Sequence, residues 1–136
     1  MGGAGMKISV DTNVLVRSVM RDHEQQALVA DKALKDAAVI AVALPVLCDF
    51  VWVLRKVYAQ APADIAAAIR ALLDTGNLAV NRPAAEAGLA MLGAGGDFTD
   101  GAIAHEGSWL GGETFVSFDR KALALLAEQG QSAALL

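Results

Sequence analysis

The sequence predicts an α/β fold, a sandwich of helices around a mainly parallel β-sheet. Short apolar segments that suit strands alternate along the chain with longer segments that suit helices. Residues 38–42 read Ala-Val-Ile-Ala-Val, and a segment without polar positions is typical of a parallel strand buried on both faces. The chain has 136 residues, of which 55% are hydrophobic. This length and composition favour a compact domain and exclude a disordered chain.

The elements expected in the first half begin with a strand at residues 7–10. Asp22 and Gln25 have the spacing of a capping box, which predicts a helix from Asp22 to residue 36. A buried strand follows at 38–42. Pro45 and Pro62 suit the first turns of helices that reach residues 58 and 74, and Gly76 ends the second of them.

The second half is expected to continue the alternation. A short strand at 78–80 precedes a helix at 83–92 and a glycine-rich loop at 93–96. Asp97 suits the N-cap of a helix that reaches residue 109. A strand at 113–117, a helix at 120–128 and a last strand at 132–136 complete the pattern. The glycines at 93–96 lack the spacing of a dinucleotide-binding loop.

Composition also limits the functional classes. Residues 1–6 are glycine-rich and lack the apolar segment of a signal peptide, so we expect a flexible leader or expression remnant before a single domain at 7–136. The longest uncharged stretch of the chain, residues 37–48, is shorter than the roughly 20 residues that span a membrane. Cys48, the one cysteine, suits core packing in a reducing cytoplasm. The net charge of −4 is unlike that of a general nucleic-acid binder, so RNA binding would need local arginines, metal ions or a second subunit.

Aspartates fall where the predicted strands end. Asp11 follows the first strand, and Asp119 follows the strand that ends near residue 118. The carboxyl ends of parallel strands share one edge of a sheet, so both side chains are expected in one crevice. Asp97 and Asp100 are three residues apart at the start of a helix and share a face. Asp49 interrupts the apolar segment 47–54 near the same edge, and we expect the five carboxylates to meet there.

Two interpretations of these aspartates are open. Asp97 and Asp119 suit ordinary N-caps. Asp49 is harder to explain in this way, because a carboxylate among apolar residues must be paired, metal-bound or on a cleft wall. Massed carboxylates repel one another unless a cation lies between them. Oxygen ligands without a His or Cys cluster indicate Mg²⁺ or Mn²⁺, which activate water and stabilise phosphoryl displacement.

Four segments together resemble the motifs of PIN domains, and especially of the VapC toxins. They lie in order and with suitable spacing between residues 7 and 126, and they are Val-Asp-Thr-Asn-Val-Leu-Val-Arg at 10–17, Leu-Cys-Asp-Phe-Val-Trp-Val-Leu at 47–54, Asp-Phe-Thr-Asp-Gly-Ala-Ile-Ala at 97–104 and Phe-Val-Ser-Phe-Asp-Arg-Lys at 115–121. The resemblance implies a PIN-like three-layer α/β/α sandwich with a mainly parallel central sheet.

The resemblance also implies roles for single residues. A cytoplasmic endoribonuclease that uses Mg²⁺ or Mn²⁺ would have as its catalytic acids Asp11, Asp49, Asp100 and Asp119. Asp11, Asp100 and Asp119 match metal-site acids, and Asp97 matches an accessory acid one helical turn earlier. Ser117 matches a hydroxyl residue that steadies the last acid by hydrogen bonding. Asn13 matches a residue that orients Asp11 or the turn after it.

One departure from the family pattern concerns Asp49, because most members have a glutamate at this position. Aspartate is one methylene shorter, so its contact with a metal would pass through water. The alternative to an active nuclease is therefore a weakened PIN-fold module that binds an antitoxin or RNA without efficient cleavage. The acidic composition also supports this alternative.

The implied partners are an RNA substrate, a cognate antitoxin and a second copy of the chain in a homodimer. Arg17, Arg120 and Lys121 lie close to the motif aspartates and are candidates for phosphate contact, whereas Arg55 and Lys56 are expected to be solvated surface charges. The two tryptophans are expected in the core or a dimer interface, not as base-stacking platforms. His105 is expected in a surface or packing role, since it is not on the face of Asp100.

A phosphoryl-transfer enzyme of another class is a further alternative. A haloacid-dehalogenase-like phosphatase would carry a second aspartate two residues after Asp11, where this chain has Asn13. A receiver domain would carry a lysine at the end of a late strand, and residues 117–120 do not supply one there. Both patterns therefore fit less well than the nuclease pattern.

Overall fold

The computed structural model describes residues 5–136, so the leader expected at the start of the chain lies mostly outside the described residues. The fold is α/β with short parallel strands, as the sequence predicts. The chain divides into two compact units, which we call unit 1 (Met1–Asn81) and unit 2 (Arg82–Leu136). None of the helices within residues 5–136 is long and apolar enough to cross a membrane.

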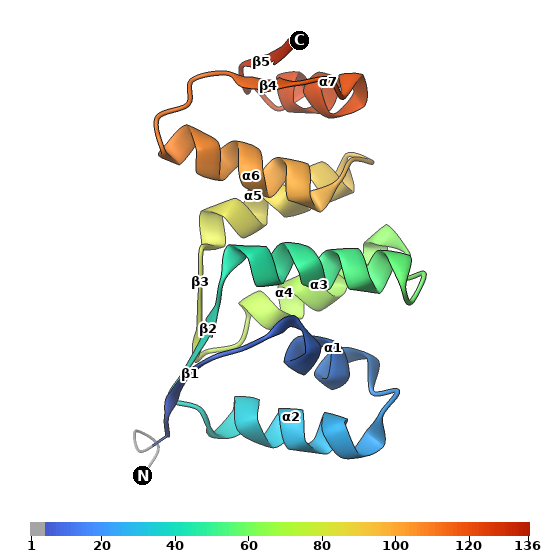
Figure 1. Ribbon diagram of the computed structural model, residues 1–136, viewed down its shortest axis with the longest axis vertical. Coiled ribbons are helices and arrows are strands. Elements are labelled where there is room, and N and C mark those ends of the chain that lie inside the picture. Colours follow the sequence, from blue (N-terminus) through green and yellow to red (C-terminus); the bar gives the residue numbers. More distant parts are fainter. Residues whose placement is uncertain (1–4) are drawn as a thin grey trace. The chain divides into compact units, whose positions relative to one another are not determined.

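Unit 1 contains a parallel sheet of three strands in the order β1-β2-β3. Lys7 pairs with Val39, and Ile40 pairs with Leu78. In Figure 1 the strands run together, with the helices of the unit beside them. The elements in chain order are β1 (Lys7–Ser9), α1 (Thr12–Met20), α2 (Glu24–Asp36), β2 (Val39–Val42), α3 (Leu44–Lys56), α4 (Pro62–Leu73) and β3 (Leu78–Val80).

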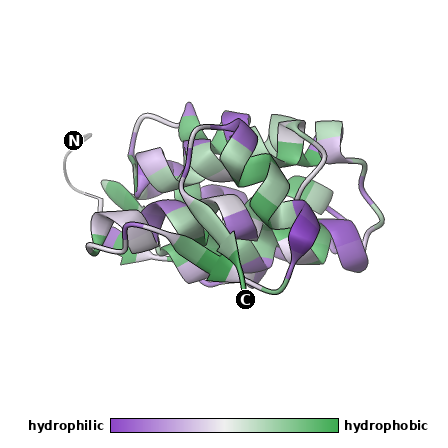
Figure 2. Ribbon diagram, turned by 90° about the horizontal axis from the view of Figure 1, so that it is seen from above, coloured by the Kyte–Doolittle hydropathy of each residue, from purple (hydrophilic) through white to green (hydrophobic). Residues whose placement is uncertain are grey.

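The helices of unit 1 are amphipathic, and each presents an apolar stripe to the interior. Phe50 and Leu54 of α3 are almost fully buried, as are Ile65 and Ile69 of α4. Their spacing of four residues places each pair on one face of its helix. Figure 2 shows hydrophobic and hydrophilic residues alternating along the ribbon of the chain. Ile40 of β2 is buried, as expected for the central strand of this sheet.

Helix α1 is absent from the elements expected from the sequence, and this is the largest difference in the fold. Its nine residues contain several β-branched and apolar positions, and this pattern is compatible with either a helix or a strand. Asp11 provides the start, because its carboxylate accepts a hydrogen bond from the Thr12 N–H at 2.8 Å. Arg21 adopts a left-handed conformation with φ of 55° and ends the helix.

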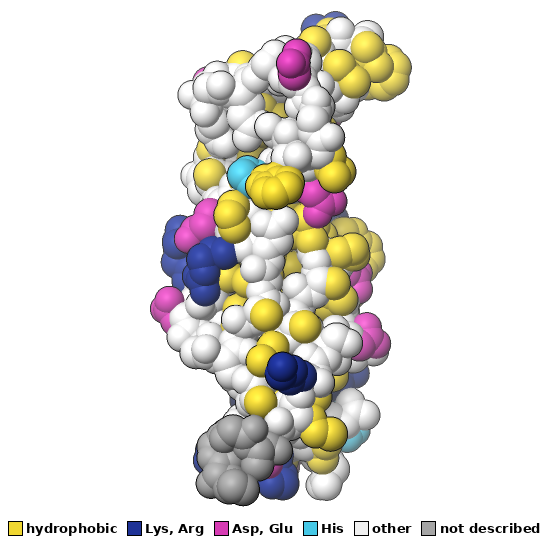
Figure 3. Space-filling model, turned by 90° about the vertical axis from the view of Figure 1, so that its left-hand side faces the viewer, with side chains coloured by type: hydrophobic (Ala, Val, Ile, Leu, Met, Phe, Trp, Pro, Cys, Tyr) yellow, Lys and Arg dark blue, Asp and Glu magenta, His cyan; other side chains and the backbone are white. Residues whose placement is uncertain are grey.

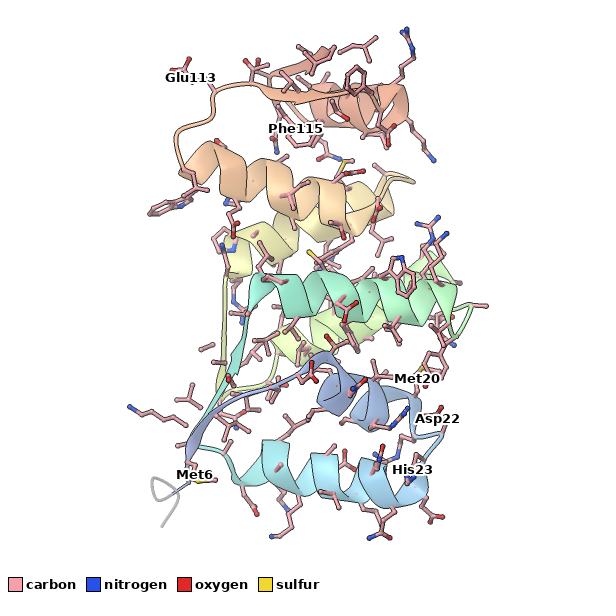
Figure 4. The ribbon with its side chains drawn as sticks, viewed as in Figure 1. Met6, Met20, Asp22, His23, Glu113 and Phe115 are labelled. Atoms are coloured by element: carbon pink, nitrogen blue, oxygen red, sulfur yellow. The ribbon has the colours of Figure 1, made fainter. Side chains whose placement is uncertain are left out.

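The start of α2 also differs from the prediction, which placed a capping box at Asp22. The N-cap is His23, whose Nδ1 accepts a hydrogen bond from the Gln26 N–H at 3.1 Å. The Asp22 carboxylate lies in the same connection (Figure 4) and accepts a hydrogen bond from the Tyr58 hydroxyl at 2.7 Å. A tertiary contact thus removes Asp22 from the cap, and the N-cap lies one residue later, at His23.

Unit 2 confirms the elements predicted for the second half of the chain. They are α5 (Arg82–Gly93), α6 (Phe98–Trp109), β4 (Phe115–Ser117), α7 (Arg120–Glu128) and β5 (Ala133–Leu135). The two strands are parallel, with Phe115 paired to Ala133. Phe115 packs against a buried cluster that includes Met91 and Leu126, whereas Glu113 points away from the unit (Figure 4).

Helices α5 and α6 approach each other closely at two glycines. A Cβ atom on Gly101 of α6 would lie 2.4 Å from the carbonyl oxygen of Ala87, which is backbone of α5. A Cβ atom on Gly88 of α5 would lie 2.6 Å from the ring of Phe98. Both glycines are buried, so the contact requires hydrogen in place of a side chain at each position. This contact determines where the first turn of α6 lies within unit 2.

Candidate functional site

Three of the predicted site residues lie together in unit 2, at the starts of two helices. Asp97 is the N-cap of α6, and its Oδ1 accepts a hydrogen bond from the Thr99 N–H at 3.2 Å. Asp119 is the N-cap of α7, and its Oδ1 accepts one from the Ala122 N–H at 3.1 Å. The capping interpretation of both residues is therefore confirmed. Asp100 lies in the first turn of α6 and caps nothing.

We call Asp97, Asp100 and Asp119 the acidic group of unit 2. The pKa of its member Asp100 is shifted. Asp100 is half-buried, whereas the other two carboxylates are exposed. Burial raises the pKa of Asp100, and the negative charges of Asp97 and Asp119 raise it further. Asp97 and Asp119 therefore repel the charged form of Asp100 at a partly desolvated position. A cation beside Asp100 would relieve that repulsion.

Ser117 fixes the turn that carries Asp119. Its hydroxyl oxygen accepts a hydrogen bond from the Asp119 N–H at 3.0 Å, across the end of β4. Its carbonyl oxygen accepts another at 3.0 Å from the N–H of Leu136, which follows β5. Ser117 thus positions the main chain of Asp119 and does not itself contact the other two carboxylates through these bonds. Hydroxyl side chains commonly form such local turns.

Asp11 occupies a similar position in unit 1, at the carboxyl end of β1. It is the N-cap of α1 and is exposed. Its carboxylate accepts from the Thr12 N–H, and its carbonyl oxygen accepts from the Val14 N–H at 3.1 Å. Asn13 is exposed in the first turn of α1 and is not among these donors. The turn after β1 is therefore held by main-chain donors and the Asp11 side chain.

Asp49 is not buried among its apolar sequence neighbours, because its side chain is exposed on α3. The buried stripe of this helix consists of Leu47, Phe50, Val51 and Leu54. Position 49 falls outside that stripe in a helix, although its sequence neighbours are apolar. Asp49 is five residues beyond Leu44, so it lies about 7.5 Å along the axis from the start of α3.

The basic residues expected near the site differ in their environments. Arg17 lies within a polar network in unit 1, where its guanidinium donates to Gln26 at 2.7 Å and to the Tyr58 hydroxyl at 3.2 Å. It also forms an ion pair with Asp22 at 3.3 Å. Arg120 and Lys121 are exposed in the first turn of α7, directly after Asp119. The α7 pair is thus better placed than Arg17 to contact a phosphate.

The network around Arg17 was not predictable from the sequence, because Tyr58 and Asp22 are 36 positions apart. No local pattern joins two such residues before the fold is known. Both tryptophans were expected in the core or a dimer interface. Their side chains are exposed, Trp52 at 56% and Trp109 at 79%, so the core assignment is wrong. His105 is half-buried on α6, and its surface or packing role stays a prediction.

The donor chemistry of the acidic group suits a hard cation, since it offers carboxylate oxygens without a thiolate or imidazole. Within residues 5–136, however, no three or more His, Cys, Asp or Glu side chains form a group that could hold a metal ion. No model of a known protein family matches the sequence, and a comparison with curated proteins finds no match either.

Proposed function

We propose that the protein is a metal-dependent endoribonuclease of the PIN type that uses Mg²⁺ or Mn²⁺. The proposal includes the three-layer α/β/α arrangement of that family and catalytic roles for Asp11, Asp49, Asp100 and Asp119. Support comes from the parallel strands and from the aspartates that follow β1 and β4, each at the start of a helix. Ligands of parallel α/β folds bind at this end of the strands.

The observation that carries the proposal is the half-buried position of Asp100 in the first turn of α6, where Asp97 and Asp119 help to raise its pKa. A carboxyl group that is half-buried and faces two other carboxylates is unfavourable for the fold alone. Such perturbed groups concentrate at functional sites, where a ligand or a reaction uses them. A divalent cation is the ligand that would turn this repulsion into attraction.

The metal would be held by Asp100 and Asp119, with Asp97 as an accessory acid. When bound, it would lower the pKa of a water molecule and stabilise the oxygens of a phosphodiester under attack. The helix caps use Oδ1 of Asp97 and of Asp119. The second oxygen of each carboxylate is not used by these caps and would be available to a cation. Ser117 would keep the Asp119 main chain in place, and Arg120 and Lys121 would attract the RNA phosphates.

The proposed biological role is that of a cytoplasmic toxin controlled by an antitoxin, with a homodimer as the assembled form. Support for a partner comes from an apolar groove of about 480 Å³ in unit 1 between α1 and α2. Val29 lies in this groove and is 61% exposed. An exposed apolar groove of this kind suits the apolar face of a partner helix.

A second candidate function is a module that binds RNA or an antitoxin without efficient cleavage. The exposed position of Asp49 favours this binding module. The short Asp49 side chain lies about 7.5 Å along α3 from its start, which is the end next to β2 where a metal would bind. Metal-dependent turnover separates the two functions. Binding without turnover would favour the module.

The test is cleavage of RNA by the purified protein in Mg²⁺ or Mn²⁺, compared with EDTA. We expect cleavage that EDTA abolishes and that Asp100→Asn reduces at least about a hundredfold, as the loss of a main electrostatic contribution does. Asp64→Asn serves as the matched control, since Asp64 is an exposed first-turn aspartate of α4 outside the motifs. Asp49→Glu is expected to raise the rate. Folded protein that cleaves nothing in any form would refute the nuclease and favour the module.

A further inference from the structure

An exposed aromatic side chain lies beside two exposed cations on α3. Trp52 is 56% exposed, and Arg55 and Lys56 are exposed as well. They follow Trp52 by three and four residues, so all three side chains lie on neighbouring positions of one helix surface. We call them the Trp52 surface. The buried stripe of α3 faces the opposite way, into unit 1.

The two cations of the Trp52 surface are available to a ligand. Neither forms an ion pair with any other residue in the 5–136 range, where Arg17, Arg21 and Lys32 do. Both cations lie in the last turn of α3, where they interact favourably with the negative end of the helix dipole. This interaction accounts for positive charge at this end of the helix. It does not account for a tryptophan that leaves more than half of its side chain in water.

Trp109 provides an internal comparison. It is even more exposed, at 79%, but it lies at the end of α6, which has no basic residue in its last turn. Leu110 follows it, and the nearest charged residues along the chain are Glu106 and Glu113. An exposed tryptophan thus has cations beside it at Trp52 and has none in the last helical turn at Trp109.

We propose that the Trp52 surface binds single-stranded RNA, with a base stacked on the indole of Trp52 and the flanking phosphates on Arg55 and Lys56. This inference rests on the proposed function and adds to it the part of the protein that holds the substrate. Sequence-tolerant binding of single strands combines aromatic faces with a cationic track. In a chain with a net charge of −4, such a local combination offsets the unfavourable overall charge.

The basic side chains are not gathered into one broad patch on the face that Figure 3 shows, where Lys and Arg form small separate groups among acidic and hydrophobic residues. A chain with a net charge of −4 cannot attract RNA through its total charge. Affinity must then come from single favourable contacts, such as stacking on an exposed indole. The other ligand that an exposed Trp and Arg would suit is a protein, and the experiment below separates it from RNA.

The first experiment measures tryptophan fluorescence in EDTA, so that no cleavage occurs, while a short oligouridylate is added. Trp109→Phe leaves Trp52 as the reporter, and Trp52→Phe leaves Trp109. We expect saturable quenching of Trp52 and none of Trp109. Equal quenching of both tryptophans, or of neither, would overturn the inference.

The second experiment measures oligouridylate affinity against salt by a method that does not use tryptophan, such as anisotropy of a labelled oligonucleotide. Trp52→Ala is expected to weaken binding about fivefold or more without changing the salt slope, because stacking is not ionic. Arg55→Gln and Lys56→Gln are each expected to lower the slope by about 0.7, the contribution of one phosphate contact on a single strand. Lys35→Gln is the matched control, since Lys35 is an exposed last-turn cation of α2.

The outcomes distinguish this inference from the proposed nuclease. Cleavage with an unchanged KM in Trp52→Ala and both glutamine variants would leave the nuclease standing and overturn the Trp52 surface. Quenching and salt-dependent binding without cleavage would do the reverse. Concentration-dependent self-association that Trp52→Ala abolishes, with no effect on oligouridylate, would assign the surface to a protein contact and overturn the RNA inference. Thermal melting of each variant verifies that it is folded.

Discussion

Two glycine-to-alanine substitutions in α6 are expected to change stability in opposite directions. At Gly101 the new Cβ atom would lie 2.4 Å from the Ala87 carbonyl oxygen and 2.6 Å from Cγ of Met91. Ordinary contact begins near 3.4 Å, so α5 and α6 must separate by about 1.0 Å. The closest obstacle is backbone, which cannot rotate away as a side chain can. At Gly107 of the same helix, a Cβ atom would have nothing within 4 Å.

The expected magnitudes follow from these distances. Overpacking in a buried contact costs about 1–3 kcal/mol, whereas alanine in place of glycine gains about 1 kcal/mol in helix propensity. Gly101→Ala should therefore lower the free energy of unfolding by about 1–2 kcal/mol, because the shortfall is large and the obstacle rigid. Gly107→Ala carries only the propensity gain, reduced near the helix end to about 0.5 kcal/mol.

The assay is urea unfolding of both variants and the parent protein in a Trp52→Phe background, where Trp109 at the end of α6 reports on unit 2. Far-ultraviolet circular dichroism provides a second probe of the same transition. A Gly101→Ala protein as stable as its parent would refute the close contact of α5 with α6. A destabilised Gly107→Ala protein would refute the open space beside the last turn of α6.

Three further predictions concern charge. Asp100→Asn is expected to stabilise the fold at pH 7 by about 0.5 kcal/mol or less, since solvent screens this half-buried carboxyl. The pKa of Asp100 is raised in the folded protein, so its destabilising effect grows as the pH rises above the ordinary aspartate pKa of 3.8 and is absent below that pH. Urea unfolding at pH 7 and at pH 3.5 tests this, and an advantage that is the same at both pH values would contradict it. Tyr58→Phe should raise the pKa of Asp22, because the Tyr58 hydroxyl bond is the largest of the contributions that lower it. NMR titration of the Asp22 carboxyl carbon measures the shift, and an unmoved titration would disprove the hydroxyl contact. Mg²⁺ at ten times its dissociation constant should stabilise the parent protein by about 1.4 kcal/mol but Asp100→Asn much less, and equal Tm shifts in the two proteins would place the ion elsewhere.

Much of the fold follows from local patterns. Pro45 and Pro62 mark helix starts, and the all-apolar segment at β2 identifies the central strand. The caps at Asp97 and Asp119 were also predictable, because a side-chain acceptor before an apolar helix is a local signal. In each of these cases neighbouring residues alone decide the structure.

The parts that could not be predicted depend on distant residues or on helical phase. Tyr58 removes Asp22 from the cap of α2 across 36 positions, and no local rule includes that contact. Asp49 and Trp52 differ, because the 3.6-residue period already places both outside the stripe of Phe50 and Leu54. The apolar composition of the segment obscured this phase. Helix α1 was not predicted for a third reason, since its short apolar segment suits a helix and a strand equally.

Asp97 and Asp119 each cap a helix and carry a negative charge, and substitutions can separate these two roles. An asparagine caps a helix about as well as an aspartate, because its side-chain oxygen accepts the same main-chain hydrogen bond. Asp97→Asn and Asp119→Asn would thus remove charge and leave the starts of α6 and α7 intact. Alanine at either position would remove the cap and the charge together. Isosteric amides therefore distinguish a carboxylate that reacts from one that only begins a helix.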